Sequence, residues 1–267
     1  MWIAVIIAAV LGLAAGALIN ICLLRTKEGL AFTFGRRACV RCAQPTAWLD
    51  HVPLLSYFAL KGKCRSCSAV IPWQYAAIEI VMAALFAGFM YQALTGYGVP
   101  AFVSSYPLHG EPLAFFMRNA VLAMLLVPVF IFDYRASVIP DRLSIPAVTI
   151  ALLVNIVLGA DVTQFLLAGL VYGSFFAVQY LASKGAWVGG GDIRIGLVIG
   201  FLLGLHLGLV ALLLSYILGS LGGAYLLITK RRKLQSHVPF GTFMVIAIFA
   251  TIFWGECLFD WYVGLLS

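Results

Sequence analysis

The sequence predicts an all-α polytopic membrane protein with about eight transmembrane helices and a small cytoplasmic cysteine (zinc-knuckle) loop domain. Of its 267 residues, 63% are hydrophobic and only 10% are charged, whereas soluble domains carry about 25% charged residues. Apolar runs close to the length needed to cross a bilayer recur along the chain. The net charge of +7 comes from basic residues in the segments between these runs, which indicates membrane orientation and not nucleic-acid binding.

The expected transmembrane helices follow from these apolar runs. No basic residue precedes the first run, and it is long enough to span, so we expect a retained helix with its N-terminus outside. The sixth run is short and is also compatible with a re-entrant segment. The runs cover residues 2–24, 75–96, 113–132, 143–160, 163–183, 193–205, 207–229 and 240–264.

The basic residues provide a test of this topology. With the N-terminus outside, all of the 17 lysines and arginines except Arg118 fall on the cytoplasmic side. An additional or missing span would mix the two sides. The positive-inside rule therefore supports eight spans with both termini outside.

A cysteine cluster lies between the first two expected helices. The chain divides into a first helix over 1–24, a cytoplasmic cysteine domain over 25–74 and a membrane domain over 75–267. The cysteine domain contains Cys39-x2-Cys42 and Cys64-x2-Cys67, and four such thiolates can close a tetrahedron around Zn²⁺. Stable disulfides are rare in the cytoplasm, so a structural zinc site is favoured over a redox or disulfide role.

Two aspartates stand out among the ten acidic residues. Asp133 ends the third span and Asp192 opens the sixth, directly after three glycines, so both lie at the cytoplasmic membrane boundary. Two carboxyl groups that share a site do not both ionise easily, and such a pair activates water against a peptide bond. Because Asp192 begins a helix and Asp133 ends one, the helix dipoles suggest Asp192 as general base and Asp133 as acid.

Three other polar residues have structural interpretations. Asp141 follows Pro140 and is interpreted mainly as the N-cap of the next helix. Asn20 and Glu79 lie inside apolar spans. They either hydrogen-bond between helices or, for Glu79, line a polar pocket, and both alternatives stay open.

The residues taken together resemble the type IV prepilin peptidases, which are bacterial membrane enzymes. Ala17 and Ala43 depart from the usual pattern, and neither touches the aspartates. The matching strings are Gly16-Ala-Leu-Ile-Asn20, Cys39-Val-Arg-Cys42 with Trp48, Pro53-Leu-Leu-Ser-Tyr57, Gly62-Lys-Cys64-Arg-Ser-Cys67, Ile71-Pro72 through Tyr75 and Glu79, Asp133 with Ile139-Pro-Asp141, Gly189-Gly-Gly-Asp192 and Pro239-Phe-Gly241.

This resemblance implies a GxGD-type aspartyl endopeptidase of the bacterial inner membrane. Its substrates would be prepilins or pseudopilins of type IV pili or type II secretion, which would lose a short basic leader at the cytoplasmic face. In many members, S-adenosylmethionine then supplies a methyl group to the new N-terminus. The alternative within the family is peptidase activity alone.

Two other classes of protein fit the sequence less well. A proton-coupled transporter would spread polar residues along several spans near the midplane and would show repeat symmetry. The acidic residues instead gather at one interface. A non-catalytic scaffold with a zinc knuckle gives no reason for two boundary aspartates on the same side.

Overall fold

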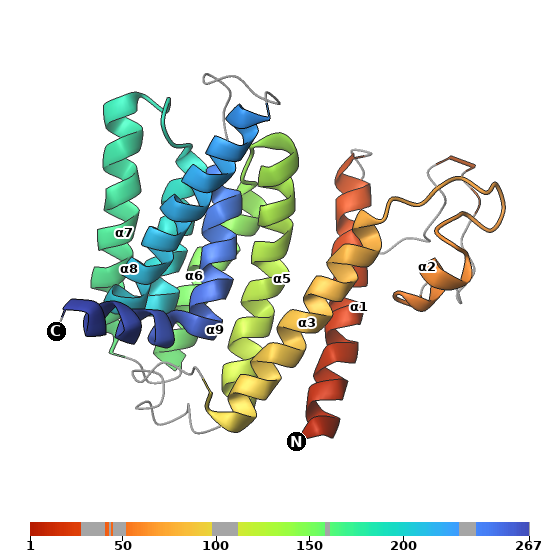
Figure 1. The fold of residues 1–267 in the computed structure, drawn as a ribbon, viewed down its shortest axis with the longest axis horizontal. Coiled ribbons are helices and arrows are strands. Elements are labelled where there is room, and N and C mark those ends of the chain that lie inside the picture. The colour runs from red at the N-terminus through yellow and green to blue at the C-terminus, as the bar shows by residue number, and fades with distance from the viewer. Residues whose placement is uncertain are drawn as a thin grey trace. The chain divides into compact units, whose positions relative to one another are not determined.

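The computed structural model describes residues 1–27, 41–42, 44, 52–97, 112–157, 161–229 and 239–266 (Figure 1). Two compact units divide the chain, Met1–Leu94 and Thr95–Ser267. In the described residues, regular structure is helical apart from one isolated antiparallel bridge between Lys63 and Val70. The all-helical class predicted from the sequence is confirmed.

The first unit pairs two long helices, α1 (Trp2–Lys27) and α3 (Gln74–Thr95), and carries a short helix α2 (Leu55–Ala59) in the connection between them. The long helices approach closely at two glycines four residues apart. A Cβ added to Gly12 would lie 2.4 Å from the carbonyl oxygen of Met82, and one on Gly16 would lie 2.7 Å from the Cα of Glu79. Such small residues allow membrane helices to pack backbone against backbone.

The second unit is a bundle of α5 (Pro112–Ala136), α6 (Asp141–Val157), α7 (Val162–Ser183), α8 (Gly190–Ile228) and α9 (Phe240–Leu266), seen in Figure 1. Asp161 caps the start of α7 by accepting a hydrogen bond of 3.0 Å from the backbone N–H of Thr163. At its other end α7 stops at Lys184, which adopts a left-handed conformation.

Helix α8 doubles back on itself at Gly204, where φ is 71° and ψ is −169°. This conformation is essentially restricted to glycine. The two arms, residues 190–203 and 205–228, run in opposite directions along α7. On the first arm, residue numbers fall as those of α7 rise, in the pairs Phe165 with Gly204, Ala168 with Gly200 and Phe176 with Gly196. On the second arm, both sets of numbers rise together, in the pairs Tyr172 with Gly208 and Gln179 with Tyr216.

Within the described residues, six helices are long and apolar enough to cross a membrane. This set counts α8 once and omits α6, which has 17 residues. Counting the arms of α8 separately and adding α6 gives the predicted number of about eight. The expected boundary between the spans 193–205 and 207–229 coincides with the reversal. The number of spans is therefore approximate, while the order of the helices agrees with the prediction.

Contacts between helices define two ends of the bundle. At one end, the backbone N–H of Thr242 on α9 donates to Asp133 on α5. At the opposite end, the buried Arg118 of α5 donates to Asn155 of α6, and Asn155 donates in turn to the carbonyl oxygen of Phe201 on α8. Both predicted aspartates lie at the first end, remote from Arg118.

Replacing Gly204 by alanine should destabilise the protein by roughly 1–3 kcal/mol, because a Cβ disfavours this backbone conformation. The measurement is the unfolding free energy of the purified protein in detergent. Gly223→Ala is the matched control, since Gly223 also lies in α8 and an added Cβ would meet nothing within 4 Å. Equal stability of the two variants would contradict the assigned conformation of Gly204.

Candidate active site

Asp133 lies near the end of α5 and is 4% exposed. Its Oδ2 accepts two hydrogen bonds from Thr242, one from the backbone N–H at 2.6 Å and one from Oγ1 at 2.9 Å. Thr242 belongs to the first turn of α9, where backbone N–H groups have no partner within the helix. The start of α9 thus supplies the donors that a buried carboxylate requires.

Asp192 lies in the first turn of α8 and is 6% exposed. Its Oδ2 accepts a hydrogen bond of 2.8 Å from the backbone N–H of Gly189, while its own N–H donates to the carbonyl oxygen of Gly189 at 3.1 Å. This reciprocal pair resembles the capping box of a helix N-terminus. The glycine string therefore folds back to hold the carboxyl group at the helix start.

The two carboxyl groups share one end of the bundle, because the side chain of Ile139 lies against both Gly191, next to Asp192, and Gly241, next to Asp133. In each carboxyl group Oδ2 is bonded, and no described residue donates to Oδ1. The two aspartates lie at the same end of the bundle, while their place at the cytoplasmic membrane boundary and their catalytic role stay predictions.

One side chain, Ile139, connects the surroundings of the two aspartates. A Cβ on Gly191 would lie 2.6 Å from the Cβ of Ile139, and a Cβ on Gly241 would lie 2.7 Å from its Cδ1. Gly241 also borders Asp133, because its added Cβ would be 3.1 Å from the Asp133 Oδ2. Glycine at both positions lets the isoleucine lie directly against two helix starts.

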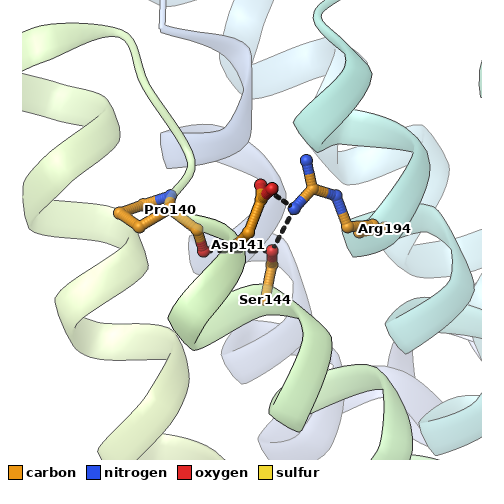
Figure 2. Close-up of polar contacts among 4 residues, drawn as sticks. All are labelled: Pro140, Asp141, Ser144 and Arg194. Atoms are coloured by element: carbon orange, nitrogen blue, oxygen red, sulfur yellow. Dashed lines mark hydrogen bonds and ion pairs between the residues drawn. The ribbon is translucent and has the colours of Figure 1, made fainter.

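Asp141 was predicted to be the N-cap of α6, but Pro140 takes that position. Asp141 is the first residue of α6, and the carbonyl oxygen of Pro140 accepts the first helical hydrogen bonds, from the N–H groups of Leu143 and Ser144. As Figure 2 shows, the Asp141 carboxylate forms an ion pair with Arg194 of α8. No sequence pattern indicated this contact, which joins residues 53 positions apart in the chain.

The cysteine motifs form a compact thiol cluster in the first unit. The Sγ atoms of Cys42, Cys64 and Cys67 all lie within 4.8 Å of one another. Two thiolates on a tetrahedral Zn²⁺ lie about 3.8 Å apart, given Zn–S bonds of about 2.3 Å, so the three thiols could bind one ion after moving closer together. Cys39, the fourth predicted ligand, lies outside the described residues.

Glu79 and Asn20 form a buried polar connection in the first unit. The Asn20 amide donates to the carbonyl oxygen of Tyr75 at 2.9 Å and to Glu79 Oε1 at 3.4 Å. Glu79 Oε2 accepts from the backbone N–H of Leu54 at 2.8 Å. Of the two sequence-based interpretations, hydrogen bonding between helices is the one observed, and Glu79 also anchors the segment that carries α2.

The chain matches two protein-family models. Residues 10–93 match the bacterial Peptidase A24 N-terminal domain, and residues 120–224 match the type IV leader peptidase family. The first region contains the thiol cluster, and the second contains the two aspartates. No solved structure matches this chain.

Curated relatives are similar over most of the chain. A prepilin leader peptidase/N-methyltransferase of Klebsiella pneumoniae is 30% identical over 67% of this chain and 82% of its own length. Proteins of the same name from Bacillus subtilis (strain 168) and Aeromonas salmonicida (strain A449) are 28% and 27% identical. They are matched over 85% and 86% of this chain and over 85% and 75% of their own lengths, respectively.

Replacing Thr242 by valine should lower the unfolding free energy by about 1–3 kcal/mol, because the buried Asp133 loses a hydroxyl donor. The backbone N–H donor remains, so the fold should persist. Thr149→Val is the matched control, since Thr149 is exposed and its hydroxyl donates only to its own helix at Ile145. Equal losses in the two variants, measured by unfolding in detergent, would contradict the role given to the Thr242 hydroxyl.

Proposed function

We propose that this chain, which belongs to the type IV leader peptidase family, is a membrane-embedded aspartyl endopeptidase that removes the basic leader of type IV prepilins or pseudopilins. The observation that carries this proposal is the pair of buried carboxyl groups, Asp133 and Asp192, at the same end of an apolar bundle. Buried ionisable groups in membrane helices are costly, and their default explanation is function.

The proposed chemistry needs one proton shared by the pair. The ionised carboxylate removes a proton from water while the protonated carboxyl donates to the carbonyl oxygen of the scissile peptide. The proposal uses the Oδ1 atoms for these contacts, because the donors among the described residues bind Oδ2. The sequence assigned the base role to Asp192 from its helix N-terminus. Asp133 also faces a helix N-terminus, that of α9, so the proposal assigns catalysis to the pair.

The proposed orientation follows from the positive-inside rule. It places both termini outside, and it places the cysteine domain and the two aspartates at the cytoplasmic face of the bacterial inner membrane. A basic leader also stays in the cytoplasm, while the apolar helix that follows it lies in the bilayer. The bond between leader and helix then reaches the interface at the depth of the aspartates.

The proposal extends to zinc and to a methyl donor. Cys42, Cys64 and Cys67, with Cys39 as fourth ligand, would hold a structural Zn²⁺ that closes the cytoplasmic domain over 25–74 between the helix 1–24 and the peptidase domain over 75–267. Four thiolates leave the metal no open position for catalysis. The names of the relatives include N-methyltransferase activity. We therefore extend the proposal to S-adenosylmethionine-dependent methylation of the new N-terminus.

Asp133→Asn and Asp192→Asn should each reduce prepilin cleavage by at least about a hundredfold, since each removes one partner of the acid–base pair. The measurement is the rate of leader removal by purified protein in detergent or lipid. Asp161→Asn is the matched control, because Asp161 caps α7 on its own and is exposed. Normal cleavage by either of the first two variants refutes the assignment.

The zinc content of the purified protein should depend on the cysteines of the thiol cluster. Purified wild-type protein should contain about one zinc per chain, and Cys64→Ser should lose most of it, because a site that keeps three thiolates binds more weakly. Metal analysis of the purified protein measures this directly. Cys257→Ser, which alters a cysteine of α9 far along the chain, should retain the metal, and equal loss in both variants would contradict the predicted ligands.

A further inference from the structure

We propose that Arg194 is a positioning residue for the aspartyl pair. It acts through the turn between α5 and α6. Ile139 in this turn lies between the start of α8, which carries Asp192, and the start of α9, which binds Asp133. The inference rests on the proposed peptidase function, because it concerns the spacing of the two carboxyl groups that would perform it.

Arg194 ties α8 to the beginning of α6. Its Nη1 forms an ion pair with Asp141 and donates to the Ser144 Oγ at 2.9 Å (Figure 2). The Ser144 hydroxyl donates in turn to the carbonyl oxygen of Pro140 at 3.1 Å. The guanidinium thus holds both the first turn of α6 and, through the serine, the residue that follows Ile139.

The burial of these side chains changes across the network. Ser144 is fully buried, the Arg194 side chain is 26% exposed and the Asp141 side chain is 69% exposed. An exposed ion pair of this kind contributes little to stability. Its fixed geometry is the more useful property, because a guanidinium that binds two partners at once restrains both of them.

The restrained turn bears directly on the helix starts at the site. Ile139 lies against Gly191 and Gly241, where an added Cβ would approach its side chain to 2.6 and 2.7 Å. Gly191 immediately precedes Asp192. Gly241 immediately precedes Thr242, which donates both hydrogen bonds to Asp133. Ile139 therefore contacts the residue before Asp192 on one side. On its other side it contacts the residue before Thr242, the donor to Asp133.

This arrangement makes Ile139 a spacer whose position depends on Arg194. Catalysis by two carboxyl groups and one water requires their spacing to be held within a fraction of an ångström, and a displacement of about 1 Å costs on the order of a hundredfold in rate. Releasing the turn should therefore reduce turnover. It should leave substrate affinity unchanged, because Arg194 need not touch the substrate.

The test compares prepilin cleavage by purified variants at Arg194, at a control position and at Ile139. Arg194→Ala should lower kcat by roughly 10- to 100-fold with KM unchanged. Arg194→Lys should fall between Arg194→Ala and the wild type, because lysine keeps the positive charge but not the rigid planar geometry of the guanidinium. Arg142→Ala is the matched control: it removes a neighbouring exposed cation, beside Asp141, and should retain wild-type kcat.

Ile139 distinguishes positioning from a general loss of structure. Ile139→Ala should reproduce the kcat loss of Arg194→Ala, and the double variant should lose no more than the more affected single variant, because both changes release the same spacer. If Arg194→Ala does not accumulate as folded protein, Arg194→Lys and its combination with Ile139→Ala provide the same test.

Three results overturn the inference while leaving the peptidase assignment intact. They are an Arg194→Ala variant with wild-type kcat, a variant whose loss lies in KM, and losses at Arg194 and Ile139 that multiply in the double variant. A wild-type protein that leaves prepilin uncleaved overturns the proposed function and this inference with it. Reduced kcat in the Arg142→Ala control also overturns the inference, since it would indicate a general effect of surface charge.

Discussion

The burial of two carboxyl groups in an apolar bundle determines where the site must lie. A carboxylate removed from water requires hydrogen-bond donors, and in a membrane helix almost every backbone N–H is already bonded within the helix. The first turn of a helix is the exception. Asp192 uses the N–H of Gly189 at the start of α8, and Asp133 uses Thr242 at the start of α9. The site therefore lies at an end of the bundle, where helices begin.

Glycines allow these helix starts and their supports to meet. Phe201 of α8 packs against α7 where a Cβ on Gly169 would clash with its ring at 2.0 Å, and a Cβ on Gly200 would meet the backbone of Ala168 at 2.4 Å. Near the aspartates, Gly191 and Gly241 admit Ile139 in the same way. Without a hydrophobic driving force between helices in lipid, such close packing is a main source of association. The same device therefore builds the bundle and sets the approach of the two helix starts.

The sequence revealed the aspartates because acidic residues are scarce in this chain and these two lie at ends of apolar runs. It also placed a boundary between the spans 193–205 and 207–229, close to the reversal that the structure shows at Gly204. The partners of the aspartates were not predictable in this way. Asp133 and Thr242 are separated by 109 positions, and Arg194 and Asp141 by 53, so nothing local links them. Their pairing depends on how α5, α6, α8 and α9 pack.

The roles of the two aspartates show how a correct local argument changes in the folded chain. From the sequence, Asp133 ends a helix and Asp192 begins one, so their dipoles differ in sign. In the fold, the start of α9 is brought against Asp133, and both carboxyl groups then face a helix N-terminus. The number of donors among the described residues also distinguishes them: Asp133 has a backbone N–H and a hydroxyl, and Asp192 has one backbone N–H. The Thr242 hydroxyl is thus a second feature, beside the direction of the parent helices, that makes the two halves of the site unequal.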